Sequence, residues 1–328
     1  MYTHQEEREV EAICYDTNHI KNVTEAIENK FENYFEDFIK LEGGSGVSQE
    51  SIKRIAKKFG VENIKTKRNI DVKDIFKNII IESIEDYEKD RGKYQAIFDE
   101  EALEEYEDDP QYFKSTVLKN ECPIIHSTIH NKRAKELDKY RYEFNISSSR
   151  ELLTIVSNLN DFSERYYNEY YNSEKYDEII NYRELAISDL DTDDYTVYGV
   201  IGGGIKSHML YKVYPAIFPN RSRDSIWALW YLTDKKKFDC KKDSEFLMID
   251  LDKNITQQNY FYPYELFTFY AHQIFQLINK KAKKYEVYID LEYRYVIVDK
   301  FLSFIAKQHE EEINLLRRQI KEGVHSYV

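Results

Sequence analysis

The sequence predicts an α+β protein that is mainly helical, in which an acidic helical N-terminal half precedes a smaller mixed α/β domain with about four short strands. Two observations predict this class. Apolar residues recur at spacings of three and four through the first part of the chain, whereas short apolar runs of strand length occur only after residue 195. A third observation, the acidic stretch Asp189–Asp194, places a boundary between the two parts.

Residues 1–42 form the first predicted segment, a helix with one buried stripe. The stripe is made by Ile13, Val23, Ile27, Phe31, Tyr34, Phe35 and Phe38. Glycines at 43, 44 and 46 read as a connector to a second segment, 47–190, with helical patterning over 51–59 and 71–87. The predicted mixed domain spans 195–328.

Four runs in that last domain are predicted as strands from their β-branched and aromatic content. They are Thr196–Ile201, Phe246–Leu251, Glu286–Ile289 and Tyr293–Val298. Helices are expected between them, one capped by Ser222 and one with Pro263 near its first turn, because these residues suit helix starts. A final long helix is expected over 299–320.

Charge is distributed unevenly along the 328 residues. Residues 1–194 carry a net charge of −17 and residues 195–328 carry +4, which together give the −13 of the whole chain. An acidic surface repels nucleic acid and attracts basic proteins. The high charge content and an acidic, polar start at 1–10 predict no membrane span and no secretory leader, hence a cytoplasmic protein. Abundant Lys, Ile, Asn and Tyr suggest A+T-rich coding, as in a low-GC bacterium or its phage.

A glycine turn followed by basic residues is the main candidate for anion or phosphate binding. Backbone N–H groups at a helix start favour anions, and guanidinium groups add charge and planar hydrogen bonding. The candidates are Gly202, Gly203, Gly204, Lys206, Arg221 and Arg223. The pattern departs from a phosphate-binding GxxxxGK[ST] loop because Ile205 separates the last glycine from Lys206, and structural roles for the turn and the arginines are the competing interpretation.

Asp250 follows an apolar run and is the candidate metal ligand in the alternative interpretation, a Mg²⁺-dependent nuclease or NTPase-like enzyme with a phosphate site in 199–250. Every catalytic pattern in the chain lacks at least one residue. The sequence therefore favours a protein that is not an enzyme and needs no cofactor.

A basic island over Lys53–Arg68 interrupts the acidic half and resembles the first helix and turn of a helix-turn-helix. Thr66 and Asn69 stand where that motif buries apolar side chains, which favours an ordinary helical hairpin. Nucleic acid could bind here or in the second half. The island could instead pair with the acidic block Glu100–Asp109, within the chain or between subunits.

Tyrosines recur near residue 170 so that Tyr166 and Tyr170, and Tyr167 and Tyr171, stack one helical turn apart. Exposed tyrosines are frequent in protein interfaces. Together with the acidic block, they predict a non-catalytic assembly protein, an accessory factor or inhibitor that docks a basic, nucleic-acid-handling partner in phage–bacterium conflict. Homo-oligomerisation is also expected from the aromatic content.

Overall fold

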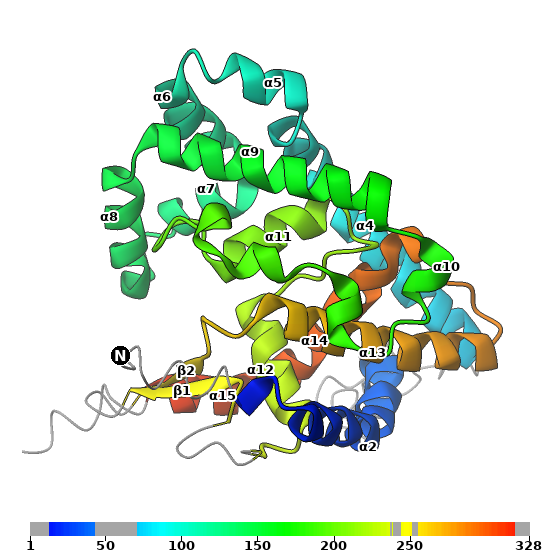
Figure 1. Cartoon of the computed structure of the whole chain (residues 1–328). Helices are drawn as coiled ribbons and strands as arrows, with labels where there is room; N and C mark the ends of the chain where they lie inside the picture. Colours follow the sequence, from blue (N-terminus) through cyan, green and yellow to red (C-terminus); the bar gives the residue numbers. More distant parts are fainter. Residues whose placement is uncertain (1–12, 43–70, 237, 239–243, 251–254, 319–328) are drawn as a thin grey trace, which may run out of the picture.

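Helices dominate the computed structural model, which describes residues 13–42, 71–236, 238, 244–250 and 255–318 (Figure 1). The side chains at 136, 250, 255 and 318 lie outside this description. The α-helices before residue 190 are α2 (Thr17–Glu42), α4 (Val72–Ile97), α5 (Glu100–Glu105), α6 (Pro110–Tyr112), α7 (Pro123–His130), α8 (Asp138–Ile146), α9 (Ser149–Arg165) and α10 (Ser173–Tyr176). The later ones are α11 (Gly203–Val213), α12 (Arg223–Leu232), α13 (Tyr264–Lys284), α14 (Arg294–Gln308) and α15 (Glu310–Arg318).

Shorter helical turns connect these elements. Two of them are π-helical, η1 (Phe113–Glu121) and η3 (Tyr166–Tyr170). The 3₁₀ turns are η2 (Lys135–Leu137), η4 (Tyr182–Leu185), η5 (Ser188–Asp191), η6 (Asp193–Tyr195) and η7 (Leu291–Tyr293). The mainly helical class is therefore confirmed.

The predicted set of four strands is wrong. The described part of the chain contains one two-stranded antiparallel sheet, β1 (Leu247–Asp250) with β2 (Ile255–Gln258), paired in the register Leu247↔Gln258. Of the four runs predicted as strands, only 246–251 overlaps an observed strand, β1. The run 196–201 makes a single bridge between Val197 and Ile201, and 286–289 is a turn followed by coil.

The fourth run, 293–298, lies almost wholly in α14. Four of its residues, Tyr295 to Val298, are at most 3 % exposed. A short run buried on all sides is uniformly apolar whether it is strand or helix, so periodicity could not distinguish the two. The expected final helix over 299–320 also differs, because α14 starts at Arg294 and the helix is interrupted at His309 before α15.

The helix starts that the sequence predicted in the later half are confirmed. Ser222 caps α12 by accepting a hydrogen bond from the Ser225 N–H at 3.0 Å. Pro263 immediately precedes α13, where its missing N–H costs no intrahelical bond. Ser222 thus marks the start of α12, which precedes the sheet in the sequence, and Pro263 marks the start of α13, which follows it.

The first and last parts of the chain share one hydrophobic core. Helix α2 packs against α12, α13 and α14, and Figure 1 shows it beneath them. Rings at Phe35 and Phe38 on α2 lie 6.5 and 5.4 Å from the ring of Phe301 on α14. The predicted segments 1–42, 47–190 and 195–328 stay a prediction.

None of the helices in the described residues is both long enough and apolar enough to cross a membrane. The connector at 43–46, the helical patterning at 51–59 and the basic island Lys53–Arg68 all fall outside the described residues.

Candidate functional sites

The glycine turn is a structural requirement at two positions. Gly199 has φ +80°, a conformation that favours glycine, and a Cβ there would lie 2.9 Å from Glu143 Cγ. Gly203 is the first residue of α11, and a Cβ on it would lie 2.2 Å from Nη1 of Arg221. The turn therefore brings the backbone of α11 against the Arg221 guanidinium.

Two of the predicted anion-binding cations are buried and already hydrogen-bonded by the protein. Lys206, 2 % exposed, donates to the Leu190 carbonyl and, at 3.1 Å, to Thr196 Oγ1. Burial lowers the pKa of the Lys206 amine to about 8, against the opposing effect of Asp191. These contacts place the amine in an internal polar network.

Arg221 is 4 % exposed and donates through Nη2 to the backbone carbonyls of Asn259 and Tyr260, at 3.1 and 2.7 Å. Burial lowers the pKa of its guanidinium, and the charge of Asp191 acts in the opposite direction. The Asp191 carboxylate accepts the Tyr264 N–H at 2.7 Å. Arg221 and Lys206 thus share one anionic neighbour.

Arg223 is the exposed member of the set and forms an ion pair with Asp224 at 2.8 Å. It lines a pocket of about 260 Å³ together with Gly204, His208, Asn220 and Arg221. Burial lowers the pKa of His208 to about 4, so its imidazole is neutral at neutral pH. The structure thus brings Gly203, Gly204, Arg221 and Arg223 together, while the anion site itself stays a prediction.

Asp250 ends β1, where it pairs with Ile255 of β2. Its side chain is outside the described side chains, so the predicted metal role at Asp250 stays a prediction.

The tyrosine stacking predicted from the sequence is confirmed. Ring centroids of Tyr166 and Tyr170 lie 6.0 Å apart, and those of Tyr167 and Tyr171 lie 5.8 Å apart. The four differ in exposure, because Tyr166 is buried whereas Tyr167 and Tyr170 are 38 % and 63 % exposed. Tyr167 also stacks on Tyr214 at 5.2 Å. An aromatic surface is therefore accessible beyond the C-terminal end of α9.

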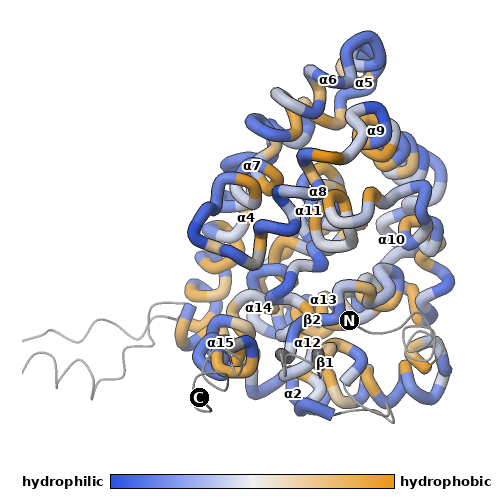
Figure 2. The backbone as a smooth tube through the Cα atoms, turned by 90° about the vertical axis from the view of Figure 1, so that its left-hand side faces the viewer, coloured by the Kyte–Doolittle hydropathy of each residue, from blue (hydrophilic) through white to orange (hydrophobic). Residues whose placement is uncertain are grey.

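Carboxylates gather at the end of the molecule formed by α5, α6 and α9, the top of Figure 1. We call this surface the acidic face. Its residues are Asp99, Glu100, Glu101, Glu104, Glu105, Glu107, Asp108, Asp109, Asp161 and Glu164. All are exposed except Glu164, which is intermediate, and none forms an ion pair with a described residue. The tube around α5 is correspondingly hydrophilic in Figure 2.

Neighbouring carboxylates of the acidic face influence the pKa of Glu164. Burial raises the pKa of this carboxyl, and the charges of Glu100 and Asp161 raise it further. Its own charge in turn raises the pKa of Tyr214, after the larger effect of burial on that phenol, which rises to about 12. The acidic face therefore adjoins the surface formed by Tyr167, Tyr170 and Tyr214, and the two meet at Glu164 and Tyr214.

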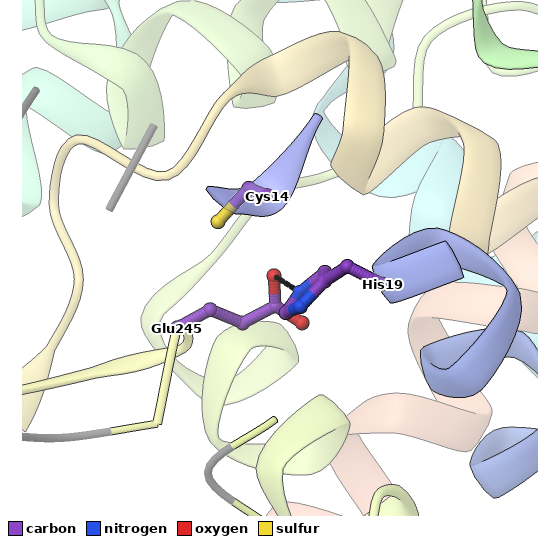
Figure 3. A group of neighbouring side chains, drawn as sticks. All are labelled: Cys14, His19 and Glu245. Carbon is purple, nitrogen blue, oxygen red and sulfur yellow. Dashed lines mark hydrogen bonds and ion pairs between the residues drawn. The ribbon is translucent and has the colours of Figure 1, made fainter. Parts of the chain in front are cut away.

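Sequence reasoning missed one group, in which Cys14, His19 and Glu245 converge (Figure 3). Their Sγ, imidazole nitrogen and carboxylate atoms all lie within 4.8 Å of one another, and the residues are 0 %, 6 % and 0 % exposed. His19 Nε2 and Glu245 Oε2 are 2.9 Å apart, and Tyr262 Oη donates to the same oxygen at 3.1 Å. Cysteine, histidine and carboxylate together are the ligand types of zinc.

Burial and the interaction with Glu245 shift the pKa of His19 in opposite directions. Burial lowers the pKa of the imidazole, but the hydrogen bond and charge of Glu245 outweigh it, so that the pKa lies above its ordinary value. Glu245 Oε1 is buried without a hydrogen-bond partner. More than two hundred residues separate His19 from Glu245, and no spacing motif links them, so no sequence signal could have found the group.

Comparison of this chain with protein-family models, with curated proteins and with solved structures finds no match.

Proposed function

We propose that this chain is a non-catalytic binding protein whose acidic face docks a basic partner protein. The observation that carries the proposal is the set of carboxylates on α5, in the turn that joins α5 to α6, and on α9, which form no ion pair with a described residue. Like charges held close together raise each other's free energy, and the charges of Glu100 and Asp161 add to the larger effect of burial in raising the pKa of Glu164. A cationic partner would relieve that repulsion and associate faster because of it.

Exposed tyrosines add an apolar component beside the charge. Tyr112 is 47 % exposed at the acidic face, and Tyr167 and Tyr170 extend the surface past Tyr214. Tyrosine supplies large contact area with few torsions to restrict, which suits an interface. A partner that handles nucleic acid fits this surface because a groove lined for phosphates also accepts carboxylates. Inhibition of such an enzyme in phage–bacterium conflict is the biological setting that we propose.

A matched pair of double variants tests the acidic face. Glu104→Gln with Glu105→Gln removes two carboxylates from α5, and Glu82→Gln with Glu85→Gln removes two exposed ones from α4. With the partner that affinity capture from the native cells identifies, we expect association about ten-fold slower for the α5 variant only, with the difference fading at high salt. Equal effects of the two variants would contradict the proposal, and so would capture of no basic partner.

Self-association belongs to the same proposal. Light scattering of the full chain should give a mass above the 39.4 kDa of one chain if the exposed tyrosines also form a homo-oligomer. The mass of a single chain would contradict the proposed homo-oligomer. It would not bear on the complex with a basic partner, which the variants of α5 test.

The pocket beside α11 favours a second candidate, a nucleic-acid or nucleotide-processing enzyme. Its support is that Gly204, Arg221 and Arg223 line one cavity. A thermal-shift screen with nucleotides, Mg²⁺ and oligonucleotides tests it, with hydrolysis lost in Asp250→Ala as the expected result. No shift with any of these ligands would contradict this candidate.

A further inference from the structure

We propose that Cys14, His19 and Glu245 bind a divalent transition-metal ion, with zinc as the best match. Each residue offers a different atom that zinc accepts, and the three atoms already lie within 4.8 Å of one another. The proposal is independent of the acidic face, which is on α5, α6 and α9.

Small movements convert the observed geometry into a zinc site. A tetrahedral zinc bound at about 2.0–2.3 Å holds its ligand atoms about 3.3–3.7 Å apart. His19 Nε2 and Glu245 Oε2, now 2.9 Å apart, would separate slightly, and Cys14 Sγ would move in from at most 4.8 Å. Figure 3 shows the His19 ring and the Glu245 carboxylate meeting from opposite sides, with the Cys14 side chain next to them. A fourth position remains for water.

The orphaned oxygen of Glu245 is the second observation that indicates a metal ligand. Glu245 is 0 % exposed, and Oε1 makes no hydrogen bond. A buried carboxylate oxygen without a partner is costly, and a coordinated cation removes that cost. Zn²⁺ with one thiolate, one carboxylate and one neutral imidazole sums to zero net charge, so the whole centre can be buried without an uncompensated charge.

Neighbouring groups supply the outer support that metal ligands need. The Tyr262 hydroxyl donates to Glu245 Oε2, and Asn259 Nδ2 donates to the Glu245 backbone carbonyl at 2.9 Å. Such contacts fix the orientation of a ligating side chain. The ion would join the start of α2 to the segment that leads into β1, so its role is to stabilise the fold.

Cobalt(II) titration of the metal-stripped full-length chain tests the site, because Co²⁺ replaces zinc and a thiolate–cobalt bond absorbs in the near ultraviolet. We expect the band to saturate at about one equivalent and to disappear when Zn²⁺ is added. Cys14→Ala should lack the band. Cys122→Ala, the matched control at a cysteine that is also 0 % exposed, should keep it.

Two further variants keep the test decisive if Cys14→Ala fails to fold. Glu245→Gln, nearly isosteric, should weaken Zn²⁺ binding at least about 100-fold, and Tyr262→Phe should weaken it about 10–100-fold. Circular dichroism checks that each variant is folded. No cobalt band in the wild-type chain, a band that persists in folded Cys14→Ala, or unchanged Zn²⁺ affinity in Glu245→Gln would each overturn the proposal.

Discussion

Four buried cationic side chains of this protein are hydrogen-bonded by specific internal partners. Lys206 and Arg221 donate to backbone carbonyls, Lys212 bonds Asp90 at 2.6 Å, and Arg294 bonds Asp177 at 2.7 Å. Removing one partner of a buried charge costs more than the net energy of the pair, because the other is left unsatisfied. Substitutions next to these groups should therefore affect stability strongly.

Gly203→Ala should destabilise the fold by about 1–3 kcal/mol, because the new methyl group displaces the Arg221 guanidinium from the carbonyls of Asn259 and Tyr260. Gly202→Ala is the matched control, since a Cβ there meets nothing within 4 Å. Denaturant unfolding of both variants measures the difference. Equal stabilities would show that Arg221 can move freely.

Asp299 introduces a pH dependence of stability. Burial raises the pKa of its carboxyl from 3.8 to about 6, against the hydrogen bond from Asn220 Nδ2 at 2.9 Å. The folded state therefore binds the proton more tightly than the unfolded chain, and the stability contributed at low pH is lost as pH rises through about 6.

Asp299→Asn keeps an oxygen to accept from Asn220 and carries no charge. We expect the variant to be more stable than the wild type by about 1–2 kcal/mol near pH 7.5. This value is reduced because the side chain is only partly buried. The difference in stability between variant and wild type should narrow near pH 5. Thermal unfolding at both pH values checks this. A gap that is the same at the two values would contradict the assignment.

Between elements, aromatic packing joins helices that are distant in sequence. The Phe301 ring of α14 lies 5.4 Å from both Phe31 and Phe38 of α2, and Phe35 meets Phe76 of α4 at 5.4 Å. Ring pairs of this kind add to the burial of area itself. The packing of α2, α4 and α14 against one another thus depends on a single cluster of phenylalanine rings.

Phe301→Ala should lower the free energy of unfolding by about 3–5 kcal/mol, because it opens a cavity among α2, α4 and α14. Phe261→Ala is the control for loss of a phenyl ring, since Phe261 is 52 % exposed. Urea denaturation compares the two. A small effect at Phe301 would mean that α2 is not held by this cluster.

On the scale of the whole molecule, the packing of α2 and α4 against the last helices predicts one cooperative unfolding transition. Calorimetry of the full chain should give coincident calorimetric and van't Hoff enthalpies. Separate transitions would instead support the division of the chain into the predicted segments 1–42, 47–190 and 195–328. The acidic face should make stability rise at moderate salt in either case.

The helical class, the cap at Ser222 and the tyrosine stacking follow from local patterns, because helix periodicity and capping depend on residues three or four apart. The acidic block is likewise visible in the chain. The sequence does not show whether these carboxylates have ion-pair partners, because it gives the charge of a segment but not the residues that pack against it.

Tertiary structure alone decided three things. It turned the run 293–298 into part of a buried helix, because an apolar run fits either structure when all its sides are covered. It enclosed Lys206 and Arg221, two of the six candidates for anion binding, among internal hydrogen-bond acceptors. It also brought Cys14 and His19 to Glu245 across the length of the chain, a proximity that arises from packing and leaves no local trace in the sequence.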